Sequence, residues 1–193
     1  MNILICGIGG QGTVLASKIL SQTALMKGYK VFSAETIGMA QRGGSVVSHI
    51  RFGNENEAPL SPLIPLHQAD VIIAFEISEA VRNIDYLKKG GVVIVNKQII
   101  QPVSASLSGK SFVENDLIDY LRNINIGHIE VVDTSTACNE IGSSKCINIL
   151  LLSVSCKFGL FEKEEIEKAM QKLIKKEYLQ LNIKALNYFL NFF

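Results

Sequence analysis

The alternation of apolar and polar positions predicts a strand, a turn and a helix at the start of the chain. Residues 2–6 form a short apolar run that ends at Gly7, and apolar side chains then recur at helical spacing over residues 13–27. Gly28 suits the position just after a helix, where a left-handed backbone is common. Residues 29–33 are predicted to form the next strand.

A further set of strands surrounds a second predicted helix. Residues 45–52 alternate between apolar and polar side chains, which predicts a strand with two different faces. Residues 71–75 and 92–95 are continuous apolar runs rich in β-branched side chains, which is typical of parallel strands covered on both faces. Between them, residues 78–89 predict a helix that ends at the following pair of glycines.

The rest of the chain is predicted to contain connections and C-terminal elements. Glycine, proline and polar residues predict connections over residues 34–44, 54–68 and 101–111. Expected elements are a helix over 115–123, a strand over 129–132, and a buried helix that starts at Ser143 or Ser144 and ends before Gly159. Acidic residues from Glu162 to Glu167 precede lysines from Lys168 to Lys176, so one last helix is expected with its charges aligned to its dipole.

This element order predicts the fold class. Because strands alternate with helices, we expect an α/β fold: a three-layer Rossmann-like domain with a mostly parallel sheet and helices on both faces. The 193 residues are 48% hydrophobic and 19% charged, which is the balance of a globular domain that buries about 70% of its unfolded surface. A single domain over residues 1–193 is therefore expected.

Charge and cysteine content narrow the function. The net charge of +1 provides no long-range field for binding nucleic acid or an anionic membrane. Because the chain shows no long apolar segment and no signal pattern, a cytoplasmic location is expected. The four cysteines, Cys6, Cys138, Cys146 and Cys156, form no C-x-x-C pair, so we expect reduced thiols in or near the core and no metal site.

The first candidate for chemistry is the glycine-rich turn Gly7-Ile8-Gly9-Gly10-Gln11-Gly12. It follows a predicted strand and opens a predicted helix, so its free N–H groups and the helix dipole favour an anion. A dinucleotide, a phosphate group or a partner surface could occupy such a turn. A dinucleotide site also needs an acidic residue at the end of the second strand, where Glu35 is the candidate.

The second candidate is the segment from Glu35 to Ser45. It places Glu35, Gln41 and Arg42 beside Gly43 and Gly44, at the expected carboxyl end of the sheet, where loops form sites. An ion pair between Arg42 and Glu35 that fixes the loop is the structural alternative. The three histidines lack metal-ligand spacing, and no catalytic residue is predicted in this chain.

Four ordered motifs carry a family resemblance. Residues 7–12, 34–51, 61–65 and 69–76 resemble the gamma-type subunit of 2-oxoacid:ferredoxin oxidoreductases, most of all the small (beta) subunit of the indolepyruvate type. The resemblance implies a subunit that completes the active-site cavity for oxidative decarboxylation of a 2-oxoacid to acyl-CoA. It implies a large partner subunit that holds thiamine diphosphate, Mg²⁺ and 4Fe-4S clusters and delivers electrons to ferredoxin.

The resemblance also implies where ligands and partners are met. The 2-oxoacid and coenzyme A would be shared ligands of the complex, and the isolated chain would be inactive. The residues carried over as candidate cofactor or interface contacts are Gly7, Gly9, Gly10, Gln11, Gly12, Glu35, Gln41, Arg42, Gly43, Gly44 and Ser45. The alternatives are a free-standing NAD- or flavin-binding oxidoreductase and a purely structural scaffold subunit.

Overall fold

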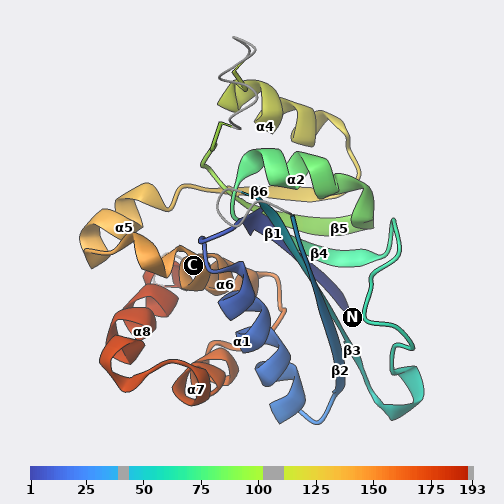
Figure 1. Ribbon diagram of the computed structural model, residues 1–193, viewed down its shortest axis with the longest axis vertical. Helices are drawn as coiled ribbons and strands as arrows, with labels where there is room; N and C mark the ends of the chain where they lie inside the picture. The colour runs from blue at the N-terminus through green and yellow to red at the C-terminus, as the bar shows by residue number, and fades with distance from the viewer. Residues whose placement is uncertain (39–43, 102–110, 191–193) are drawn as a thin grey trace.

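The computed structural model describes residues 1–38, 44–101 and 111–190, and Figure 1 shows its layers. Its strands form one six-stranded sheet in the order β2-β3-β1-β4-β5-β6. Their bounds are β1 Asn2–Ile8, β2 Lys30–Ile37, β3 Ser45–Gly53, β4 Ala69–Ala74, β5 Leu87–Asn96 and β6 His128–Val132. The strands predicted at residues 2–6, 45–52, 71–75, 92–95 and 129–132 are all present.

The sheet is mostly parallel, as the sequence predicts. The ladders β1–β4, β4–β5 and β5–β6 are parallel, whereas β3 pairs antiparallel with both β1 and β2. Because β3 lies between β1 and β2, the second strand of the chain is not a neighbour of the first. This order differs from a Rossmann sheet, in which the first two strands are adjacent.

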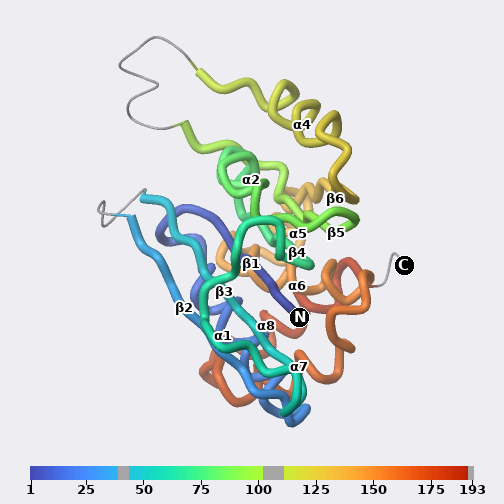
Figure 2. The backbone as a smooth tube through the Cα atoms, turned by 90° about the vertical axis from the view of Figure 1, so that its right-hand side faces the viewer, coloured from blue at the N-terminus to red at the C-terminus, as the bar shows by residue number. Residues whose placement is uncertain are grey.

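Helices cover both faces of the sheet, which confirms the three-layer α/β fold (Figures 1 and 2). Alternate side chains of each strand serve the two faces, so Ile3 and Ile5 join one apolar cluster while Leu4 and Cys6 join the other. The helices on the first face are α1 Thr13–Met26, α5 Ser135–Ile141, α6 Ile147–Lys157, α7 Lys163–Leu173 and α8 Lys176–Leu190. Those on the second face are α2 Ile77–Asn83 and α4 Glu114–Asn123.

Two predicted boundaries are wrong on the second and fifth strands. The connection predicted from residue 34 begins later, because β2 continues to Ile37, which pairs with Val46 of β3. The helix predicted over 78–89 ends at Asn83, and after a short 3-10 turn β5 begins at Leu87. Leu87 is fully buried against the second face, and Gly90 continues the strand with φ 78° instead of ending a helix.

The C-terminal region contains more helices than predicted. The charged stretch forms two helices, because α7 ends at Leu173 and Lys176 already begins α8. Helix α5 was not predicted. Ser143 caps a 3-10 turn over Ser144–Cys146, and the buried helix α6 follows it.

The expectation for Gly28 is confirmed, because it follows α1 with φ 83°. Glu162 and Glu165 form a capping box at the start of α7, which was not predicted. All four cysteines are free thiols, with Cys6 and Cys146 buried. Within the described ranges, no helix has both the length and the apolar character needed to cross a membrane.

Candidate functional site

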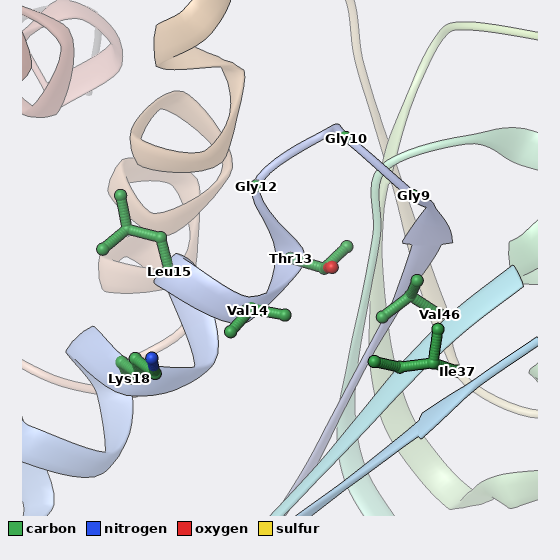
Figure 3. A pocket seen from close by; sticks show the side chains of 9 residues that line it. All are labelled: Gly9, Gly10, Gly12, Thr13, Val14, Leu15, Lys18, Ile37 and Val46. Carbon is green, nitrogen blue, oxygen red and sulfur yellow. The ribbon is translucent and has the colours of Figure 1, made fainter. Parts of the chain in front are cut away.

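The glycine-rich turn connects β1 to α1 at the carboxyl end of the parallel strands (Figure 3). Gly10 and Gly12 have φ angles of 100° and 90°, a backbone conformation that side chains with a Cβ rarely adopt. Gly7 is required for a different reason, since a Cβ there would lie 2.9 Å from Cβ of Phe75. These glycines therefore allow both the sharp turn and its close contact with β4.

The turn presents the start of α1, a helix of 14 residues. Gly12 is the N-cap residue, and no described side chain caps the first turn. The first N–H groups of a helix have no partner within it, and the helix dipole adds partial positive charge there. This end of α1 is therefore suited to an anionic group.

A cavity of about 430 Å³ lies beside the turn, between α1 and the ends of β2 and β3 (Figure 3). Ile37 and Val46 form its wall on the strand side. Lys18 is its one charged lining residue, and the ammonium group forms no ion pair within the described part of the chain. The lining residues are Gly9, Gly10, Gly12, Thr13, Val14, Leu15, Lys18, Ile37 and Val46.

Gln11 points inward and stabilises the turn. Its Oε1 accepts a hydrogen bond from the Ile8 N–H at 2.7 Å, and its Nε2 donates to the Phe75 carbonyl at 3.4 Å. The same Nε2 lies 3.5 Å from Oε1 of Gln98, which follows β5. Gln11 thus connects the ends of three strands, a structural role at the edge of the candidate site.

The structure brings the end of the second candidate segment against the glycine turn. The Gly9 N–H donates to the Gly44 carbonyl at 2.9 Å, and the Gly38 N–H donates to the Ser45 carbonyl at 2.8 Å. Gly44 is therefore held against the turn, and Gly38 is held against Ser45, the residue that follows Gly44. Of the predicted contacts, Gln41, Arg42 and Gly43 lie outside the described residues.

Ser45 has a second anchor in the buried carboxyl group of Glu79. Its Oγ donates to Glu79 Oε2 at 2.5 Å, and Arg82 donates to Glu79 Oε1 at 2.7 Å. Glu79 is 1% exposed, so these bonds replace the hydration that burial removes. Ser45 is thus directed into the protein, where it joins the start of β3 to α2.

A second buried carboxyl group lies next to Glu79. Glu76 caps α2, and its carboxyl group accepts from the Ser78 hydroxyl at 2.6 Å, the Glu79 N–H at 2.9 Å and the Ile100 N–H at 3.1 Å. Burial, together with the charges of Glu79 and Glu76, raises the pKa of the Cys6 thiol well above its ordinary value. Cys6 is therefore a buried neutral thiol and not a nucleophile.

Glu35 does not lie next to the glycine turn. It is exposed on β2, where its register partner is Ser48 of β3, and β3 separates β2 from β1. An acidic residue that binds a ribose in a Rossmann site stands on the strand adjacent to β1. The strand order therefore weighs against the dinucleotide interpretation, and the Glu35–Arg42 pair stays a prediction.

Comparison with known proteins identifies the family. Residues 2–190 match the family described as pyruvate ferredoxin/flavodoxin oxidoreductase. The chain belongs to this family. It is 36% identical to the indolepyruvate oxidoreductase subunit IorB of Archaeoglobus fulgidus, with 96% of this chain and 92% of that protein covered. The pyruvate/ketoisovalerate oxidoreductases common subunit gamma of Pyrococcus furiosus is 28% identical, with coverages of 93% and 89%.

Solved structures of the family share the fold. The gamma subunit of a keto/oxoacid ferredoxin oxidoreductase from Geobacter sulfurreducens superposes with a TM-score of 0.66 at 24% identity, covering 96% of this chain and 94% of that one. The 2-oxoglutarate:ferredoxin oxidoreductase of Magnetococcus marinus gives 0.70 at 18% identity, covering 97% of this chain but 30% of that longer chain. Together with the family match, the identity to IorB and gamma subunits over most of the chain shows that it is a small subunit of the 2-oxoacid:ferredoxin oxidoreductase type.

His49 and His128 lie in separate surroundings and form no shared site. His49 is buried, its Nδ1 accepts from the Ile64 N–H at 3.2 Å, and burial lowers the pKa of its ring. His128 is exposed and contacts Glu130. Among residues 1–38, 44–101 and 111–190, no three His, Cys, Asp or Glu side chains are arranged to hold a metal ion.

Sequence reasoning missed two residues of the site. Lys18 of α1 lines the cavity, and Glu79 of α2 accepts a hydrogen bond from Ser45. The signal for Lys18 was available, because it is the one basic residue between Met1 and Met26 and follows the glycine turn by about one and a half helical turns. Glu79 offered no signal, since only the fold brings α2 to the start of β3.

Proposed function

We propose that this chain is the small subunit of an indolepyruvate-type 2-oxoacid:ferredoxin oxidoreductase and completes the cavity in which a large subunit decarboxylates its substrate. The observation that carries the proposal is the junction of two motifs at one edge of the sheet. The Gly9–Gly44 hydrogen bond joins the residue before β3 to the turn that leads into the uncapped end of α1. The 36% identity to IorB subunits supports the indolepyruvate type.

The role proposed for the turn is to bind an anionic group of a shared ligand. The 2-oxoacid carries a carboxylate and coenzyme A carries phosphates, and both suit the N–H groups of α1 and the Lys18 ammonium. The Magnetococcus relative is described with 2-oxoglutarate, coenzyme A and succinyl-CoA bound, which supports a site for these classes in the assembled enzyme.

The redox and decarboxylation cofactors are proposed to lie on the large subunit. Cys6 is enclosed in the sheet, and burial raises the pKa of Cys146 to about 11 and that of Cys156 to about 12. Neutral thiols of this kind, which form no cluster of ligands among the described residues, do not fit an iron–sulfur centre. Thiamine diphosphate, Mg²⁺ and the 4Fe-4S clusters therefore belong to the partner in this proposal, and ferredoxin reacts with the complex.

Reconstitution tests the proposal. The chain would be purified alone and together with the thiamine-binding large subunit that the proposal requires, and indolepyruvate-dependent reduction of ferredoxin would be measured with coenzyme A present. We expect activity in the complex and none in either chain alone. Activity of this chain by itself would refute the subunit assignment, and preference for another 2-oxoacid would refute the indolepyruvate type.

A cofactor-binding assay tests the free-standing alternative. NADH or FAD would raise the melting temperature of the isolated chain if it were a nicotinamide or flavin oxidoreductase. We expect no shift, because the strand order moves Glu35 away from β1.

A further inference from the structure

A second and larger cavity lies among the helices of the first face. It measures about 670 Å³, which is within the range of pockets that bind small molecules. Helices α1, α7 and α8 and the turn between α5 and α6 surround it, and these segments pack together on one side of the sheet (Figure 1). It is lined by Leu15, Gly142, Ser143, Lys145, Leu173, Ile174, Lys175, Tyr178, Leu181 and Asn182.

The lining has a polarity that selects a class of ligand. Leucine side chains from α1, α7 and α8 and Ile174, which lies between α7 and α8, form the apolar part of the lining, and Tyr178 adds an aromatic ring. Lys145 and Lys175 are its charged lining residues, and no acidic side chain lines the cavity. Neither ammonium group forms an ion pair with a carboxylate of the described residues, so both are free to pair with an anion.

Local hydrogen bonds fix the backbone on two sides of this cavity. Gly142 ends α5 with φ 82°, and a Cβ built on it would meet nothing within 4 Å. The chain then turns at Ser143, whose Oγ accepts from the Lys145 N–H at 3.2 Å and so fixes the backbone of this lysine. On the other side, Asn182 Nδ2 donates to the Tyr178 carbonyl at 2.8 Å within α8.

We propose that this cavity binds a small organic anion that combines an aromatic or short aliphatic body with one carboxylate, sulfonate or phosphate group. The apolar body lies on Leu173, Ile174 and Leu181, and the anionic group pairs with Lys145 and Lys175. The site is distinct from the cavity beside the glycine turn, although Leu15 lines both. The proposal is independent of the reaction that the assembled enzyme performs.

A matched pair of probes tests this chemistry on the full chain alone. Naphthylacetate and naphthylacetamide have nearly the same shape, but only the first is charged, while acetate supplies the anion without the apolar body. Each would be titrated into methyl-labelled protein and followed by the NMR signals of Ile174 and Leu181. We expect naphthylacetate to bind about tenfold more tightly than the amide, because two lysines attract it, and acetate to cause no shift.

Variants assign the preference to the two lysines. Lys145→Gln with Lys175→Gln should reduce the affinity for naphthylacetate to that of the amide, while the amide binds as before and so reports an intact apolar lining. Lys89→Gln with Lys168→Gln changes the net charge equally at lysines outside the cavity and should leave both affinities unchanged. Equal binding of acid and amide to the unaltered protein, or shifts that bypass Ile174 and Leu181, would overturn the proposal.

Discussion

Gly10→Ala tests whether the glycine turn approaches a ligand or partner in the assembled enzyme. Gly10 has φ 100°, and a Cβ built on it meets no atom of this chain within 4 Å. Within the chain itself, the substitution therefore costs only backbone strain, about 1–2 kcal/mol for a left-handed residue with a Cβ. Part of that is offset by about 0.4–1 kcal/mol, because alanine restricts the unfolded chain.

Gly159→Ala provides the matched control. Gly159 follows α6 with φ 68°, and a Cβ there also meets nothing within 4 Å, so its stability cost is of the same kind. It lies outside both cavities. A difference in activity between the two variants therefore reports what surrounds Gly10 in the complex.

The assay is steady-state turnover of the reconstituted enzyme, with the melting temperature of each variant measured in parallel. We expect both variants to lose similar stability. Only Gly10→Ala should also lose about tenfold in turnover, or in the affinity of the enzyme for coenzyme A or the 2-oxoacid, which corresponds to about 1.4 kcal/mol. Equal activity of the two variants at equal stability would refute the close approach to Gly10 and favour the scaffold interpretation.

Three further predictions concern the site and its supports. Lys18→Gln should raise the KM for one anionic substrate about threefold to tenfold with kcat little changed, whereas the control Lys89→Gln should leave KM unchanged. A fall in kcat with no change in KM would contradict a binding role for Lys18. Ser45→Ala should lower the free energy of unfolding by about 1.5–3 kcal/mol, because it removes a hydrogen-bond donor to buried Glu79. If the losses caused by Ser45→Ala and Glu79→Gln simply added in the double variant, the interaction between the two residues would be contradicted. Because burial lowers the pKa of His49 below its ordinary value of 6.5, the unfolded chain binds the proton more readily. The free energy of unfolding should therefore fall as pH drops below 6.5. Denaturation midpoints measured across this pH range check this, and the assignment would be refuted if His49→Gln showed the same pH dependence as the unaltered chain.

The buried strands were predictable because burial of apolar side chains alone determines their residue pattern. The apolar runs within β4 and β5 are covered on both faces, so composition alone distinguishes them from amphipathic segments. Gly28 was predictable because a helix end requires its positive φ. The glycine turn was predictable in place and shape, since local backbone requirements define it.

The errors lie where long-range pairing decides the structure. The last residues of β2, up to Ile37, are exposed and show no apolar pattern, and it is pairing with β3 that makes them a strand. The start of β5 reads as the end of a helix, because Leu87 continues the apolar spacing of α2. Its burial between β4 and the second helical face decides in favour of a strand. Local sequence carries little information about either outcome.

The position of β3 explains why Glu35 does not lie on the strand next to this turn, although the turn has dinucleotide spacing. In a Rossmann site the acidic residue that follows the second strand reaches the ribose of a ligand on the turn. In this chain an antiparallel strand occupies that neighbouring position, and it brings Gly44 into hydrogen-bond contact with Gly9. The start of α1 keeps N–H groups without helical partners, which suit an anion, but Glu35 lies across the sheet from them and is not placed to select a ribose. The ligand proposed for this turn is therefore an anionic group that makes no ribose contact with Glu35.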